Sequence, residues 1–203
     1  MCEERSAMNY LLVYSHPNPK SFNHAIVQTI AAEFKKAGQD MLFRDLYAMH
    51  FSPVLAADDF TATQEGSVRD DVREEQEMIR AADVLIVVYP LWWSGMPAML
   101  KGYIDRVFSY GFAYEINENG GVGLLTGKKV FLVTTMGASR EDYEQLGMFR
   151  SLDQVIDTGI FRFSGMEVID HRYYPSVPYV TVDDRKQMLE DIGCQVREKL
   201  LSL

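Results

Sequence analysis

Two apolar runs decide the fold: VLIVVY at residues 84–89 and VFLVTT at residues 130–135. Both are rich in β-branched residues and do not alternate with polar ones, which is typical of strands covered on both faces. Shorter apolar runs predict three further strands at residues 9–14, 41–46 and 166–170. Strands that alternate with helices indicate an α/β fold with a doubly wound parallel sheet.

Helices are expected between these strands. The clearest has apolar residues at helical spacing, namely Phe22, Ile26, Ile30 and Phe34. The predicted helical ranges are 22–37, 65–80, 97–108, 145–163 and 183–201. Right-handed crossovers then bring the loops that follow the strands to one edge of the sheet, where ligands of such folds bind.

Length and charge limit the possible functions. The chain has 203 residues, with 20 Lys and Arg against 29 Asp and Glu, a formal net charge of −9. We expect one domain over residues 1–203, with residues 1–8 as a flexible tail. The acidic balance argues against nucleic acid as a partner, because the phosphate backbone would be repelled.

Cysteine, histidine and leader patterns point to a cytoplasmic protein without metal. Cys2 and Cys194 form no CxxC pair. The residues His24, His50 and His171 share no ligand spacing, so no metal site is expected. We interpret these histidines as surface or packing residues. The first eight residues, MCEERSAM, do not resemble a secretion signal. The longest apolar stretch, residues 84–93, is half the roughly 20 residues that a membrane span needs, so the chain is not expected to be membrane-embedded.

The loop at residues 15–23, SHPNPKSFN, carries no acidic residue and leads into the first helix. Exposed amides and the helix dipole at such a position favour a phosphate group. The alternative is that Ser21 only caps the helix while the prolines shape a turn. The loop alone leaves both readings open.

The loop at residues 90–97, PLWWSGMP, holds both tryptophans of the chain between two prolines. Prolines fix the backbone and leave the intervening N–H groups outside regular structure, where they could read a flat heteroaromatic ring stacked beside indole. An aromatic plug in the core or at a dimer contact is the other reading.

The loop at residues 134–143, TTMGASREDY, offers hydroxyls, a glycine and a tyrosine as donors to an anionic acceptor, as in an oxyanion site. A simple turn with a helix cap is its alternative. Taken together, the phosphate-friendly, aromatic and donor-rich loops at one sheet edge favour a flavin nucleotide laid across a flavodoxin-type sheet.

At these residues the chain resembles a known family. The most specific blocks are HPNPKSFNHA (16–25), PLWWSGMPAMLKGYIDRVFSYGFAY (90–114), GLLTGKKVFLVTTMGA (123–138) and GIFRFSGMEV (159–168). They resemble the NAD(P)H:quinone oxidoreductase (DT-diaphorase-like) family of flavodoxin-like flavoproteins, in its short bacterial branch. The resemblance implies a five-stranded sheet of order 2-1-3-4-5 with helices on both faces, and it covers residues 10–201.

The resemblance also implies roles for individual residues. Matching positions in the family hold the flavin phosphates and ribityl chain (His16, Ser21, Phe22, Asn23), line its rings (Pro90, Leu91, Trp92, Trp93, Ser94) and face its pyrimidine end (Thr134, Thr135, Met136, Gly137, Tyr143). Tyr143 and Gly137 would be catalytic, and Trp93 would contact substrate. Tyr114 would close the substrate pocket from the partner subunit of a homodimer. Arg185 stands where longer members place an arginine near the adenine of FAD, which favours FAD over FMN.

Two departures from the family pattern concern the site. Phe149 stands six residues beyond Tyr143, where the best-known members have a histidine, so a Tyr–His proton relay is in doubt. Met136 replaces a glycine and could narrow the pocket or alter the flavin contact.

The implied activity is ping-pong hydride transfer from NAD(P)H to the flavin and then to a quinone, with azo or nitro compounds as further acceptors. Two other functions remain open at this point. One is a flavodoxin-type electron carrier, which the double-tryptophan pocket argues against. The other is a regulatory ancillary subunit of a membrane transporter, for which the acidic stretch 58–77 could bind a basic partner, although a solvated helix explains it as well.

Overall fold

A parallel five-stranded sheet forms the centre of the chain, which the computed structural model describes for residues 8–203. Its strands are β1 (Tyr10–Tyr14), β2 (Met41–Asp45), β3 (Val84–Pro90), β6 (Lys129–Thr135) and β7 (Glu167–Tyr174). They lie in the order β2-β1-β3-β6-β7, which confirms the predicted order 2-1-3-4-5. The expected N-terminal tail, apart from Met8, and Cys2 lie outside the described residues.

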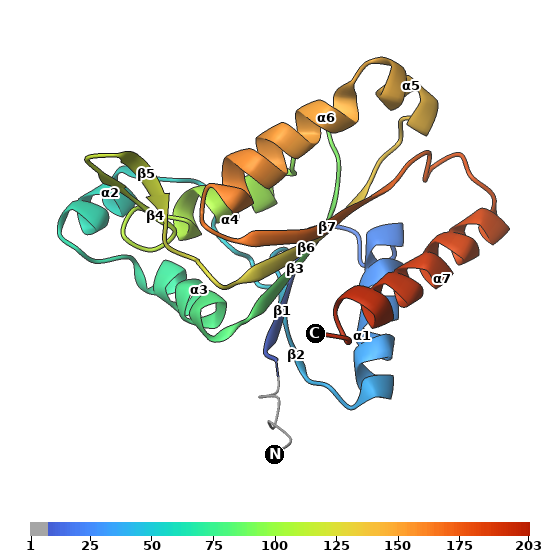
Figure 1. The fold of residues 1–203 in the computed structure, drawn as a ribbon, viewed down its shortest axis with the longest axis horizontal. Coiled ribbons are helices and arrows are strands. Elements are labelled where there is room, and N and C mark those ends of the chain that lie inside the picture. The colour runs from blue at the N-terminus through green and yellow to red at the C-terminus, as the bar shows by residue number, and fades with distance from the viewer. Residues whose placement is uncertain (1–7) are drawn as a thin grey trace.

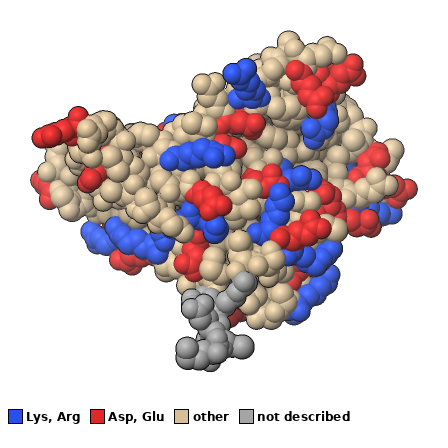
Figure 2. All heavy atoms as spheres, in the orientation of Figure 1, with Lys and Arg blue, Asp and Glu red and all other residues tan. Residues whose placement is uncertain are grey.

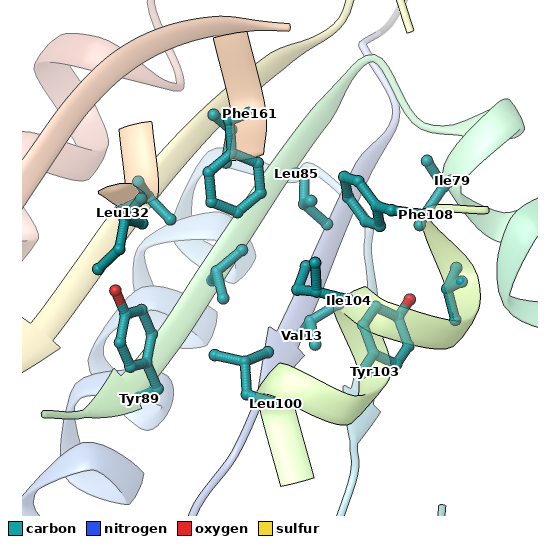
Figure 3. Packing of buried hydrophobic residues seen from close by; sticks show 14 of the residues in the cluster. Val13, Ile79, Leu85, Tyr89, Leu100, Tyr103, Ile104, Phe108, Leu132 and Phe161 are labelled. Atoms are coloured by element: carbon teal, nitrogen blue, oxygen red, sulfur yellow. The ribbon is translucent and has the colours of Figure 1, made fainter. Parts of the chain in front are cut away.

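Helices cover both faces of the sheet (Figure 1). On one face, α1 (Phe22–Ala37) and α7 (Val182–Lys199) pack their apolar residues against β1, β3 and β6. The other face is covered by α3 (Asp70–Ala81), α4 (Ala98–Val107), α6 (Met148–Leu152) and the π-helix η1 (Asp153–Arg162). Figure 3 shows Phe108 and Phe161 meeting the strand residues Leu85 and Leu132 in this second layer. The central strands are therefore buried on both sides, as their apolar runs predicted.

A hairpin between α4 and β6 was not predicted. Its strands, β4 (Tyr114–Asn117) and β5 (Gly120–Gly123), pair antiparallel outside the main sheet. The segment lacks an apolar run because glycines stand where it meets the body of the protein. A Cβ atom on Gly123 would lie 2.2 Å from the backbone nitrogen of Gly165, so this approach requires glycine.

The predicted helix over residues 145–163 is wrong in its start and its regularity. Short helix α5 (Arg140–Gln145) comes first, and Gly147, with φ of +67°, separates it from α6. Only glycine takes such a left-handed backbone freely, so the chain breaks there. The remaining ten residues, η1, form a π-helix, a rare geometry that often accompanies functional sites.

A further helix, α2 (Ala57–Gln64), was also missed, and α3 begins at Asp70 rather than at residue 65. Arg106 of α4 fixes this region. Its buried guanidinium donates to Asp59 of α2, to Asp71 of α3 and to the carbonyl oxygen of Ser52. The three-way contact ties α2, α3 and the residues before α2 to α4.

Charged side chains of both signs are interspersed on the face shown in Figure 2, rather than gathered by sign. Several charged side chains of the protein are paired, as in the contacts of Lys129 with Glu167 at 2.6 Å and of Lys199 with Asp170 at 2.8 Å. Within residues 8–203, no helix has the length and apolar content that crossing a membrane requires.

Candidate active site

A cavity of about 1080 Å³ lies at the carboxyl ends of β1, β3 and β6. All three loops singled out in the sequence contribute to it, together with a fourth. The lining residues are His16, Ser21, Phe22, Asn23, Pro90, Leu91, Trp92, Trp93, Thr135, Met136, Gly137, Ala138, Val177, Pro178 and Tyr179. The cavity therefore occupies the sheet edge where the crossovers were expected to collect the loops.

The N-terminus of α1 forms one end of the cavity. Ser21 caps this helix, because its hydroxyl accepts the amide hydrogen of His24 at 3.1 Å. The phenol of Tyr14 lies 3.2 Å from the same oxygen and fixes the hydroxyl. The first turn contains no acidic residue, and the amides of Phe22 and Asn23 precede the first intrahelical bond. Capping and anion binding are thus compatible here, since the cap satisfies one amide and leaves others for a ligand.

Asn23 connects this helix end to β6. Its amide nitrogen donates to the hydroxyl of Thr135 at 2.7 Å, and both side chains are buried. Within residues 8–203, the buried amide oxygen of Asn23 has no hydrogen-bond partner, and neither has the buried hydroxyl of Ser15. Buried polar atoms are rarely left unpaired, and Asn23 is one of the residues that line the cavity, so its oxygen fits a ligand that carries a donor such as a hydroxyl.

His16 lines the same side of the cavity and can donate a hydrogen bond to a ligand. Its Nδ1 accepts the amide hydrogen of Asn18 at 3.0 Å, which leaves Nε2–H free to donate in the neutral ring. Partial burial holds the pKa of His16 below its ordinary value, so the neutral form dominates near pH 7. The ring meets Trp92 edge-on, with centroids 5.7 Å apart.

The double-tryptophan loop forms a strained turn. Trp92 and Gly95 exchange two backbone hydrogen bonds of 3.0 Å, and between them Trp93 and Ser94 have φ of +50° and +54°. Side chains other than glycine pay about 1–3 kcal/mol for this geometry, and such strain gathers at functional sites. The turn exposes the Trp93 side chain completely, at 103%. An aromatic plug in the core is thereby excluded for Trp93, and ligand or partner contact remains.

The third loop is held by backbone bonds on two sides. The amide of Leu91 donates to the carbonyl of Thr135 at 2.7 Å, and the amide of Met136 donates to that of Tyr174 at 2.9 Å. The Met136 side chain is buried in the core layer shared with α4 and η1. It therefore packs inward, and its backbone, with that of Gly137, forms the cavity wall.

Thr134 does not line the cavity. Its hydroxyl is buried and lies 2.9 Å from Nε2 of His171. The Nδ1 atom of the same ring lies 2.7 Å from Asp157 of η1, so Thr134, His171 and Asp157 form a buried hydroxyl–imidazole–carboxylate chain. Tyr173 stacks on His171 with centroids 4.0 Å apart and donates to Asp153 at 2.8 Å.

His171 is thus a buried member of a polar network rather than a surface residue. Asp153, Asp157 and His171 each offer one atom that could bind a metal ion, a carboxylate oxygen or a ring nitrogen, and these three atoms lie within 4.8 Å of one another. However, both ring nitrogens of His171 already have partners, Thr134 on one side and Asp157 on the other. We therefore interpret the cluster as a hydrogen-bond network.

Four other predicted residues are not among those that line the cavity. Ser94 and Tyr143 face each other, with their hydroxyl oxygens 3.2 Å apart. The guanidinium of Arg185 donates to the carbonyl of Val177 at 3.0 Å and so supports a lining residue from behind. Tyr114 lies on the hairpin, where its ring contacts Phe163 at 5.4 Å, away from the cavity of its own chain.

Sequence reasoning missed Ala138 and the segment Val177–Tyr179, which follows β7. Topology offered a signal for the segment, because it leaves the fifth parallel strand at the same edge of the sheet. Its amide at Val177 donates to the Met136 carbonyl at 3.0 Å, which fixes it beside the third loop. Tyr179 is 83% exposed and adds another aromatic ring to the cavity lining.

Comparisons with known proteins agree with this architecture. The flavodoxin-like fold family matches residues 8–200. A Haemophilus influenzae protein named "uncharacterized NAD(P)H oxidoreductase" is 36% identical over 197 residues, which cover 97% of this chain and 98% of the relative. NAD(P)H dehydrogenase (quinone) 1 of Rattus norvegicus is 33% identical over 200 residues, 89% of this chain and 73% of that protein.

Among solved structures, the NAD(P)H:quinone oxidoreductase of Methanothermobacter marburgensis superimposes with a TM-score of 0.85 at 28% identity. The match covers 95% of this chain and 96% of that one. Fold, family match and relatives agree over nearly the whole length: the chain belongs to the flavodoxin-like fold family and is a relative of the NAD(P)H:quinone oxidoreductases.

Proposed function

We propose that this protein is a flavin-dependent NAD(P)H:quinone oxidoreductase. One observation carries the proposal: a single cavity at the carboxyl edge of the sheet joins the acid-free N-terminus of α1 to the strained turn that bears Trp93. An elongated ligand with an anionic group at one end and flat rings at the other suits this arrangement, and a flavin nucleotide has that form. The names of the relatives supply the substrate classes, NAD(P)H and a quinone.

The residues present fit such a nucleotide. In the proposal, the amides of Phe22 and Asn23 with Ser21 and His16 receive its phosphate. The unpaired amide oxygen of Asn23 accepts from a hydroxyl of its sugar-alcohol chain. Two segments would hold its rings: the backbone of Pro90, Leu91, Trp92, Trp93 and Ser94, and that of Thr135, Met136 and Gly137.

The flavin, when bound, supplies hydride acceptance and hydride donation. The chain's own residues bind and orient the reactants. NAD(P)H and then the quinone occupy the same place beside Trp93, which is the basis of a ping-pong order. The Gly137 amide and the Tyr143 hydroxyl act as fixed donors to negative charge that develops during reduction. Loss of one such donor would slow the reaction about a hundredfold.

FAD is the proposed form of the flavin, with FMN as the alternative. Support comes from the part of the cavity that extends to Val177, Pro178 and Tyr179, beyond the loops that suffice for a mononucleotide. Arg185 holds this segment through the Val177 carbonyl. In this proposal Arg185 does not contact the adenine itself. It positions the cavity wall that the adenine half of FAD would contact.

A homodimer completes the proposed site. Tyr114 lies away from the cavity of its own chain, so it could close a substrate pocket only from a partner subunit. Tyr110, half exposed and packed edge-on against Tyr114 at 5.8 Å, would lie at the same contact. Gel filtration at several concentrations tests the dimer.

Purification with identification of the bound chromophore tests the proposal. Heat-released cofactor is identified by chromatography, and oxidation of NADH and NADPH is measured with menadione as acceptor. We expect a yellow protein that releases FAD and reduces the quinone with a saturable rate. A colourless protein that binds neither FAD nor FMN contradicts the proposal. A flavin-loaded protein without NAD(P)H-dependent quinone turnover identifies an electron carrier instead.

A further inference from the structure

We propose that Ser94 is the positioning partner of Tyr143 and passes it a proton from solvent. The proposal rests on the proposed function of the same site. It is carried by the 3.2 Å contact between the two hydroxyl oxygens, which joins the turn after β3 to α5. Ser94 thereby does more than line a flavin site.

The backbone at Ser94 is strained because the residue lies in the tight turn between Trp92 and Gly95. Its φ is +54°, a conformation that serine rarely adopts and that glycine would take without cost. Gly95 is adjacent, yet the serine stands in the left-handed position. Strain of about 1–3 kcal/mol persists only where the surroundings hold it, and here the hydroxyl reaches Tyr143.

Phe149 packs against Tyr143 but exchanges no proton with it. The two ring centroids are 5.6 Å apart, and the far side of Phe149 meets Tyr173 at 5.0 Å. The guanidinium of Arg140 covers Phe149 at 5.4 Å. Phe149 therefore fixes the plane of the Tyr143 ring and leaves its hydroxyl to another partner.

His171 is not that partner. Both of its ring nitrogens are occupied by Thr134 and Asp157, and its side chain is 3% exposed. The rings of Tyr173 and Phe149 stand between it and Tyr143 in the chain of aromatic contacts. Within residues 8–203, the hydrogen bond found for the Tyr143 side chain is the one to Ser94.

The proposed reaction needs one proton from solvent. A quinone becomes a hydroquinone by gaining one hydride and one proton: NAD(P)H is the source of the hydride, a bound flavin would supply the chemistry for its transfer, and the proton completes the second O–H bond. Tyr143 gives its hydroxyl proton to the oxyanion, Ser94 gives its own to Tyr143, and water restores Ser94. Each hydroxyl loses one proton and gains one, so both end unchanged. Ser94 is exposed, which gives water access to the outer end of the pair.

Binding of 4-nitrophenolate to the oxidised, flavin-loaded protein tests the pair without turnover. This phenolate is a stand-in for the hydroquinone anion, and its binding is measured from the change in the visible flavin spectrum. Loss of one hydrogen bond costs about two- to tenfold in affinity. We expect Ser94→Ala to weaken binding by that factor, Tyr143→Phe to weaken it at least as much, and the double variant to lose no more than Tyr143→Phe.

Ser94→Gly is the matched control, because it removes the hydroxyl and relieves the backbone strain. If the hydroxyl acts, the alanine and glycine variants bind 4-nitrophenolate with the same reduced affinity, and both show a larger solvent isotope effect on quinone reduction. Unchanged affinity in Ser94→Ala, or losses that add fully in the double variant, would overturn the proposal. A wild-type protein that holds no flavin or reduces no quinone refutes the proposed function instead.

Discussion

His171 and Asp157 form a hydrogen bond of 2.7 Å beneath the end of β6, where both side chains are almost fully enclosed. Nδ1 of the imidazole faces the carboxylate and Nε2 faces the Thr134 hydroxyl at 2.9 Å, so the ring links the two groups. The bond joins β7 to the π-helix η1, and Thr134 adds β6 to the same chain. The network thus stands directly behind the strand end whose next residues form the cavity wall.

Replacing His171 with leucine should lower the free energy of unfolding by about 3 kcal/mol, because it leaves the buried Asp157 without its partner. Urea denaturation of the flavin-free protein measures the effect. The variant His171→Leu/Asp157→Leu is the control, since it removes both polar groups. We expect the double variant to be no less stable than the single one. A single variant as stable as wild type would show that the pair contributes nothing to stability.

Ser21→Asp separates helix capping from phosphate binding. Aspartate caps a helix as well as serine does, so the free energy of unfolding of the flavin-free protein should change by less than about 0.5 kcal/mol. A carboxylate beside the proposed phosphate should nevertheless weaken FAD and FMN binding at least about tenfold. Fluorescence titration measures both affinities.

Riboflavin is the control ligand for Ser21→Asp because it has the rings and the sugar-alcohol chain but no phosphate. Its affinity should be the same for wild type and variant. Equal losses for riboflavin and FMN would place the effect elsewhere in the cavity and remove the phosphate from the N-terminus of α1.

Asn23 and Thr135 offer a matched pair of substitutions. Thr135→Val removes the hydroxyl that accepts from the Asn23 amide nitrogen, but it leaves the Asn23 amide oxygen in place. Asn23→Ala removes both the amide nitrogen and the amide oxygen. We expect both variants to lose about 1 kcal/mol of unfolding free energy. Flavin affinity, measured by fluorescence titration, should fall clearly more in Asn23→Ala. Equal affinities in the two variants would mean that the Asn23 oxygen accepts no bond from the ligand.

The sequence was sufficient for the sheet because β3 and β6 have apolar runs that only a doubly covered strand needs. It was insufficient where tertiary contacts decide the local structure. The hairpin depends on the close approach of Gly123 to Gly165, and α2 is held by the contact of Asp59 with Arg106. Neither contact leaves a periodic pattern that reading along the chain could detect.

The candidate site was predicted in the same uneven way. Three loops were found because they follow buried strands, and most of the individual site residues predicted in them line one cavity. The sequence did not show that Thr134 turns inward while Thr135 faces Asn23, because that depends on which face of β6 each residue occupies. His171 was interpreted as a surface or packing residue because the histidines share no ligand spacing in the sequence. Its contact with Asp157 of η1 depends on the tertiary structure and leaves no such spacing.

Arg106 should make the stability of the fold sensitive to acid. Hydrogen bonds from its guanidinium hold the pKa of Asp71 below the ordinary value. Burial by itself would raise the pKa of Asp59. The hydrogen bonds from Arg106 and from the Ala56 amide outweigh this effect, so the pKa of Asp59 is also below its ordinary value. A carboxylate whose pKa is lower in the folded state stabilises the fold above its unfolded pKa of about 3.9. That stability is lost as the pH falls through the folded value.

Arg106→Met should therefore lower the free energy of unfolding at pH 7 by about 3 kcal/mol, because Asp59 stays buried without its partner. The difference between variant and wild type should shrink as the pH falls below about 4, where the two carboxylates take up protons. Urea denaturation at pH 7, 5 and 3.5 measures both effects. Lys186→Met is the control, since Lys186 pairs with the exposed Asp183 and should change stability by less than about 1 kcal/mol at any pH. A pH-independent loss in Arg106→Met would show that the arginine acts through packing on Phe51, whose ring it covers at 5.5 Å, and not through its carboxylates.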